Sequence, residues 1–156
     1  MIAIRLLMAA LASLSLAGAC ECSDPTVQNA KERANVIFRG TITALRPLRP
    51  TDKRVWIGDP GDTGKIAVFR VARVWKGEVG PVFEMPAIQE GGGCWGFAPQ
   101  FLKLGTELIV YAFRVEGAYF TGICSRTNLP KFATKDFEEL GPGEPPRPSP
   151  ARSNSK

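Results

Sequence analysis

Runs of β-branched and aromatic residues, separated by proline- and glycine-containing turns, predict a mainly β domain. The predicted strands cover residues 36–42, 66–75, 82–88, 108–114 and 119–123. The last two form a hairpin across Glu116-Gly117, and Pro86 marks the third as an edge or bulged strand. Five short strands are typical of a small closed or partly open barrel.

Two helices and a tail complete the predicted domain. Residues 23–25 offer a capping side chain and an early proline, and apolar residues at helical spacing then predict a short surface helix. Residues 131–140 predict a second helix that stops at Gly141. Residues 142–156 are rich in Pro, Ser and Arg, which predicts a disordered tail.

Residues 1–19 have the three parts of an export signal. A short start with Arg5 precedes the apolar run 6–16, which is too short to cross a bilayer as a helix. Residues 17–19, Ala-Gly-Ala, then place small side chains at the cleavage position. We therefore expect a secreted protein, extracellular or periplasmic, whose mature chain begins at Cys20. No later stretch is long and apolar enough to predict a transmembrane segment.

A cysteine directly after small residues can also signal a lipoprotein. That route would place a lipid anchor on Cys20 and acylate its amine. The signal usually has a large aliphatic residue three positions before the cysteine, where this chain has Ala17. Ordinary cleavage is therefore the favoured interpretation.

Charge and composition exclude several classes of function. The formal charge is +5, but Arg5 lies in the signal and Arg147, Arg152 and Lys156 lie in the tail, so the domain lacks the basic face that nucleic-acid binding needs. The chain has no histidine, which excludes Ser-His-Asp and Cys-His catalysis and histidine-ligated metal.

Other candidate residues favour structural roles. The carboxylates in apparent turns or at strand edges are better explained as solvated than as an acid/base pair: Asp59, Asp62, Glu84 and Glu90. The aromatics Trp56, Trp75, Trp95 and Phe97 favour core or rim packing over a stacking surface. We therefore expect no enzymatic activity and no cofactor.

The four cysteines, Cys20, Cys22, Cys94 and Cys124, favour two disulfides in an exported chain. A direct Cys20–Cys22 bond would have poor geometry. Two pairings remain, and each ties the mature N-terminus to Cys94 and Cys124. A four-cysteine zinc site is disfavoured because the usual spacing is missing. Chain ends normally fray, but two disulfides would make this end unusually rigid. Such rigidity could serve either to present the terminus to a partner or simply to stabilise a small barrel.

Several segments together resemble a known family. They are Cys20-x-Cys22, Ala34-Asn35-Val36-Ile37-Phe38-Arg39-Gly40, Phe69-Arg70-Val71, Val74-Trp75-Lys76-Gly77, Cys94, the strand containing Tyr111, and Cys124-Ser125-Arg126-Thr127. In this order, residues 20–141 resemble the inhibitory domain of tissue inhibitors of metalloproteinases (TIMPs), and more broadly the netrin-like module.

The resemblance implies a five-stranded OB-fold barrel with a short N-terminal helix and a C-terminal helix. It also implies the pairings Cys20–Cys94 and Cys22–Cys124. In the inhibitors, the amine and carbonyl of the first cysteine chelate the catalytic zinc of a metalloprotease, a role that maps to the main-chain N and O of Cys20. The implied inhibitory ridge comprises Cys20, Glu21, Cys22, Ser23, Gly92, Gly93 and Cys94.

Two interpretations of function remain open from the sequence. The first is a TIMP-like inhibitor in which Glu21 enters the pocket beside the zinc, so that a target with a basic pocket fits best. The second is a non-inhibitory netrin-like module that binds an envelope or extracellular protein through barrel loops such as residues 45–65. Acetylation of the N-terminus would separate the two.

Overall fold

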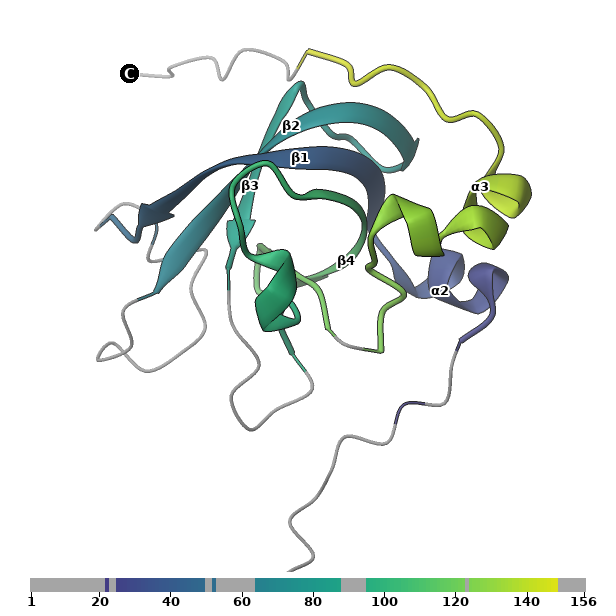
Figure 1. Cartoon of the computed structure of the whole chain (residues 1–156), viewed down its shortest axis with the longest axis horizontal. Coiled ribbons are helices and arrows are strands. Elements are labelled where there is room, and N and C mark those ends of the chain that lie inside the picture. Colours follow the sequence, from purple (N-terminus) through teal and green to yellow (C-terminus); the bar gives the residue numbers. More distant parts are fainter. Residues whose placement is uncertain are drawn as a thin grey trace, which may run out of the picture.

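The described part of the computed structural model contains five strands and two short α-helices (Figure 1). The described residues are 22, 25–49, 52, 64–87, 95–122 and 124–148. In chain order, the elements are α2 (Val27–Arg33), β1 (Val36–Pro47), β2 (Lys65–Lys76), β3 (Val82–Pro86), η2 (Pro99–Phe101), β4 (Glu107–Val115), β5 (Ala118–Phe120), η3 (Pro130–Phe132) and α3 (Thr134–Leu140), where η denotes a 3-10 turn.

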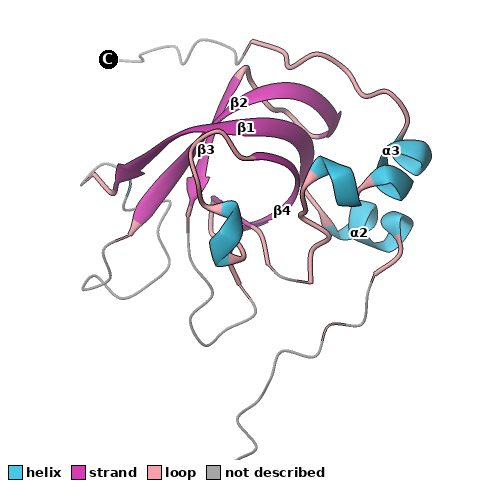
Figure 2. Cartoon of the chain, viewed as in Figure 1, coloured by secondary structure: helices cyan, strands magenta, loops and turns pink. Residues whose placement is uncertain are grey.

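All neighbouring strands pair antiparallel, in the order β3-β2-β1-β4-β5. The sheet curls into a half-barrel (Figure 2). Its two edge strands approach each other: the ring centroids of Phe83 on β3 and Tyr119 on β5 are 5.2 Å apart. Register shifts occur in the β1–β2 ladder, for example between Ile37 and Phe38. Such irregularities bend a strand and increase its twist, which allows the sheet to curl.

The main core lies on the concave side of the sheet. Phe38, Phe69 and Phe97 are fully buried there, and the rings of Phe38 and Phe69 meet edge-to-face at 5.4 Å. Met85 and Leu108 fill the same cluster without exposed surface. The β-branched and aromatic runs of the sequence therefore do form a β core.

A second cluster joins the two α-helices to the convex side of β1 and β4. Ile37, Ile109 and Tyr111 face this side and are buried with Ala30 of α2. Figure 1 shows α2 and α3 side by side at this end of the sheet. Because both faces of β1 are covered here, residues 36–38 form a continuous buried run instead of an alternating one.

The first helix begins later than predicted. Thr26 is its cap: the backbone there is extended and its hydroxyl accepts a hydrogen bond from the Asn29 amide at 3.1 Å. Pro25 therefore lies before the helix instead of in its first turn. Thr26 is suited to this position because its hydroxyl accepts a hydrogen bond from an amide of the first turn that would otherwise be unpaired.

Two other differences concern the C-terminal region. The predicted helix 131–140 is divided into η3 and α3, and it ends as expected at Gly141, whose φ is 79°. The first part of the predicted disordered tail is paired: Glu144 and Val74 exchange two backbone hydrogen bonds of 2.8 Å. This part of β2 extends beyond β3, so its edge is open for the tail to occupy. The ordered chain thus continues past Gly141, and residues 149–156 lie outside the described residues.

Candidate functional site

Cys22 is the member of the predicted inhibitory ridge that the structure describes. The other predicted residues, Cys20, Glu21, Ser23, Gly92, Gly93 and Cys94, lie outside the described residues, as do the export signal and the tail end 149–156.

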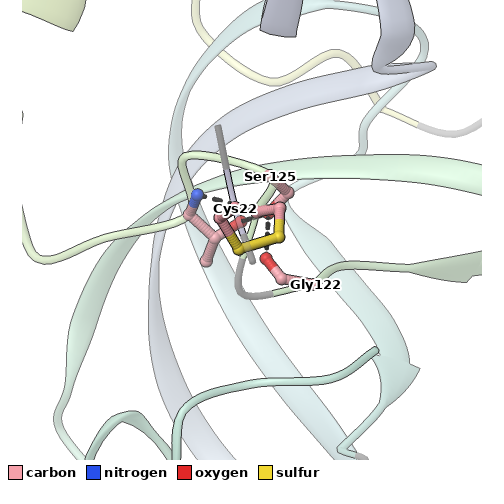
Figure 3. The surroundings of a disulfide bond; sticks show 5 residues. Cys22, Gly122 and Ser125 are labelled. Carbon is pink, nitrogen blue, oxygen red and sulfur yellow. Dashed lines mark hydrogen bonds between the residues drawn. A yellow bond between two sulfur atoms is a disulfide. The ribbon is translucent and has the colours of Figure 1, made fainter. Parts of the chain in front are cut away.

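A disulfide joins Cys22 to Cys124, with 5.2 Å between their Cα atoms (Figure 3). The bond spans a sequence separation of 102 residues and fixes the N-terminal segment to the segment that follows β5. Of the two pairings that the residues left open, this bond belongs to the one that the resemblance implies. The other predicted pair, Cys20 and Cys94, lies outside the described residues.

Hydroxyl groups hold the turn around Cys124 in place. Ser125 donates to the Gly122 carbonyl at 2.6 Å, as Figure 3 shows. Thr121 donates to the Tyr111 carbonyl at 3.0 Å, and its oxygen lies 2.6 Å from the hydroxyl of Thr127. These bonds fasten the turn to β4, so Cys124 is a fixed attachment point for Cys22.

A buried ionic network lies next to this turn. Arg126 donates to both carboxylate oxygens of Asp136, from Nε at 2.9 Å and from Nη2 at 2.7 Å. Tyr111 Oη donates to the same carboxylate at 2.6 Å. The Asp136 side chain is only 3% exposed, and the network connects α3 to the middle of β4.

The network shifts two pKa values in opposite directions. Burial alone would raise the pKa of Asp136, but the hydrogen bonds from Arg126 and Tyr111 and the positive charge of Arg126 outweigh it and hold that pKa below its usual value. Burial raises the pKa of Tyr111, and the hydrogen bond that its hydroxyl donates to the Asp136 carboxylate raises this pKa further. At neutral pH the network therefore holds an ionised carboxylate and a neutral phenol.

The same arginine also contacts the N-terminal segment. Arg126 Nη1 donates to the carbonyl of Pro25 at 2.8 Å. Pro25 directly precedes the cap of α2, so this bond and the disulfide hold the same short segment.

Trp95 lies beside this region of the structure. It forms a β-bridge with Gly122, and the amide of the next residue, Gly96, donates to the Thr121 carbonyl at 2.8 Å. The Trp95 ring packs edge-to-face on Phe113 with 5.0 Å between centroids, yet the residue remains 51% exposed. A mostly apolar pocket of about 280 Å³ adjoins it, lined in part by Pro25, Ala30, Ala34, Phe113 and Cys124.

The remaining aromatic and acidic candidates that the structure describes are not brought together in one site. Phe97 is in the core, and Trp75 packs on Phe137 and donates to the Gly141 carbonyl at 2.8 Å. Glu84 forms an ion pair with Arg46. The other candidates, Trp56, Asp59, Asp62 and Glu90, lie outside the described residues.

Two features are absent from the described residues. These residues contain no group of three or more Cys, Asp or Glu side chains able to hold a metal ion. No helix among them has the length and apolar character needed to cross a membrane.

Arg126 and Tyr111 belong to the segments that resemble the TIMP family, whereas Asp136 does not. A signal was present, because Asp136 is three residues after buried Ala133 and four before Leu140, which places an acid on the apolar side of the helix. A carboxylate in such a position requires a cationic or hydrogen-bonding partner.

A scan against models of known protein families and a search of curated proteins gave no match to this chain.

Proposed function

We propose that the protein is an exported, TIMP-like inhibitor of zinc metalloproteases that acts through a mature N-terminus at Cys20. The amine and carbonyl of Cys20 would chelate the target's zinc, with the amine displacing the zinc-bound water and the carbonyl adding a fifth ligand. The observation that carries the proposal is the Cys22–Cys124 disulfide, which anchors the chain two residues beyond the proposed ligand.

The fold supports the proposal at the level of strand order. The order β3-β2-β1-β4-β5, with β3 and β5 approaching each other, agrees with a five-stranded OB-fold barrel whose last seam is closed by side chains. Helices at both ends of the domain agree with the same architecture. We therefore propose the OB fold as the finer description of the curled half-barrel.

The position of Trp95 supports the second proposed disulfide, Cys20–Cys94. Trp95 follows Cys94 in the chain and pairs with Gly122, which is two residues before Cys124. Consecutive Cα atoms are separated by only 3.8 Å. Chain connectivity thus favours a ridge in which the segment before Trp95 flanks the anchored N-terminus.

The chemistry of the proposed ligand is suitable for a zinc enzyme. A catalytic zinc retains one position for water or substrate, which an exogenous amine can fill. An α-amine has a pKa of about 7.7–8, so a useful fraction is neutral near physiological pH. The disulfide restrains the segment before binding, which lowers the ordering cost of association.

The test is an extension of the mature N-terminus. Purified protein is first sequenced to establish that Cys20 is its first residue, and inhibition is then measured against a panel of zinc proteases that includes enzymes with basic pockets beside the zinc. One alanine added before Cys20 should abolish inhibition, whereas one alanine added after Lys156 should leave it unchanged. Equal potency of the N-terminally extended form would reject chelation by Cys20.

A second candidate function is a netrin-like protein-binding module that uses the loop between β1 and β2. It is favoured by the salt bridges at the base of that loop, where Arg46 contacts both Asp52, at 2.6 Å, and Glu84 on β3. Acetylation of the N-terminal amine would leave binding through this loop intact but would abolish inhibition through Cys20. Both proposals describe a binding protein without enzymatic activity of its own.

A further inference from the structure

We infer that Arg126 is a positioning residue that, together with the Cys22–Cys124 disulfide, clamps the N-terminal segment in its binding orientation. This inference rests on the proposed function for its consequence in inhibition. The clamp itself is a property of the free protein and can be tested separately.

The guanidinium group makes this clamp because each of its three nitrogen atoms has a different hydrogen-bond acceptor. Nε and Nη2 donate to the two oxygens of Asp136, and Nη1 donates to the Pro25 carbonyl. The planar, rigid fork of arginine matches a carboxylate and leaves a third donor at a fixed angle. A lysine ammonium cannot reproduce this arrangement.

The clamp is attached to buried residues of α3 and β4. Asp136 accepts from Tyr111 of β4 as well as from Arg126, and both Asp136 and Tyr111 are almost completely buried. The Arg126 backbone has a φ of 68°, a left-handed conformation that is strained for a residue with a side chain. Such conformations persist where surrounding contacts determine them strongly.

The hydrogen bond and the disulfide connect the same two short segments. Pro25 is three residues after Cys22, and Arg126 is two residues after Cys124. The disulfide restrains the segment at Cys22 and the Arg126 hydrogen bond restrains it at Pro25, so the two ties together restrict its direction as well as its distance. For a ligand that must meet a metal ion in one orientation, the second tie lowers the ordering cost of binding.

The experiment compares two double variants of the full-length mature protein. Arg126→Gln with Asp136→Asn removes the clamp without leaving an unpaired charge, because both new side chains are neutral. Arg39→Gln with Glu107→Gln is the matched control, since that pair has the same two-bond geometry, at 2.9 Å each, but lies on the sheet between β1 and β4. Arg126→Lys is a milder second variant, which retains the positive charge beside Asp136.

The first measurement is backbone ¹⁵N relaxation of the free proteins. In the clamp variants, we expect the order parameters at Cys22, Thr26 and Val27 to fall from about 0.85 toward about 0.6, with no change in β1 or β4. The control should keep wild-type values throughout. Unchanged N-terminal order parameters in a folded clamp variant, either the double variant or Arg126→Lys, would overturn the inference.

The second measurement is inhibition of a zinc protease that the wild-type protein inhibits. We expect the clamp variants to bind about tenfold or more weakly, mainly through slower association, and the control to bind like wild type. Wild-type potency in the clamp variants would overturn the role of Arg126 in inhibition. If the wild-type protein inhibits no zinc protease, the proposed function fails, and the relaxation measurement still decides whether the clamp exists.

Discussion

The two tyrosines of this chain provide a controlled test of the buried network. Tyr111→Phe removes only the hydroxyl that donates to Asp136 at 2.6 Å, and the ring remains in the core. A hydrogen bond to a charged group contributes about 1.5–3 kcal/mol to stability. Because Asp136 keeps both bonds from Arg126, we expect the free energy of unfolding to decrease by about 1.5–3 kcal/mol.

Tyr119→Phe is the matched control, because no hydrogen bond of its hydroxyl is present among the described residues and its ring packs on Phe83. Urea unfolding of the three proteins should give equal slopes against denaturant concentration, with a lower midpoint for Tyr111→Phe alone. A loss below about 0.5 kcal/mol for Tyr111→Phe, or an equal loss for both variants, would refute the argument that this bond stabilises the fold.

The Tyr119→Phe protein also isolates Tyr111 for titration with alkali. Since the pKa of Tyr111 is raised in the folded protein, the unfolded chain loses this proton first as the pH increases. The stabilisation is therefore complete below the unfolded pKa of about 10 and is lost as the pH rises above it. Tyrosinate absorbance should appear together with the loss of circular dichroism. Absorbance that appears while the protein is still folded would show that the hydroxyl is not held as described.

Two further predictions concern the stability of the protein at acid pH and the effect of replacing Gly77. The pKa of Asp136 is lowered in the folded state, so its contribution to stability should be present above about pH 4 and lost as the pH falls through the folded pKa. Denaturant unfolding between about pH 5 and pH 2 should therefore show a larger loss of stability in wild type than in Asp136→Asn, which retains the loss due to Asp52, whose pKa is also lowered by its hydrogen bond from Arg46. Gly77 has a φ of 78°, and a Cβ there would lie 2.5 Å from the Asn35 carbonyl, so Gly77→Ala should cost more than the ~1–2 kcal/mol of a left-handed alanine. Gly105→Ala, with a φ of 80° and nothing within 4 Å of the added carbon, gives the backbone cost alone, and equal losses at both positions would contradict the predicted clash.

The strands were predictable because their signal is local. β-branched and aromatic composition located all five strands of the described residues, and Pro86 lies on an edge strand of the sheet, as predicted. The hairpin was predictable for the same reason, since Glu116 and Gly117 both adopt the positive φ that a two-residue turn of type I′ requires.

The buried network was not predictable in the same way, because its partners are distant in sequence. Arg126 meets Asp136 ten residues later and Pro25 about one hundred residues earlier. The sequence alone does not show which arginine faces a buried acid until the helix and the sheet are packed together. The pairing of Glu144 with Val74 was missed for a similar reason, since the open edge of β2 depends on the short length of β3.

The presence of a buried ion pair here is better explained by positioning than by stability. Apolar groups of similar volume often replace a buried pair with no loss of stability, because desolvation of the charges offsets their attraction. A triple replacement, Arg126→Met with Asp136→Leu and Tyr111→Phe, removes every charge and hydroxyl of the network together. If the network serves stability, this variant should unfold more easily than wild type. If it serves to orient the N-terminal segment, the variant should match wild type in free energy of unfolding within about 1 kcal/mol, while its inhibition of a zinc protease falls as in the clamp variants.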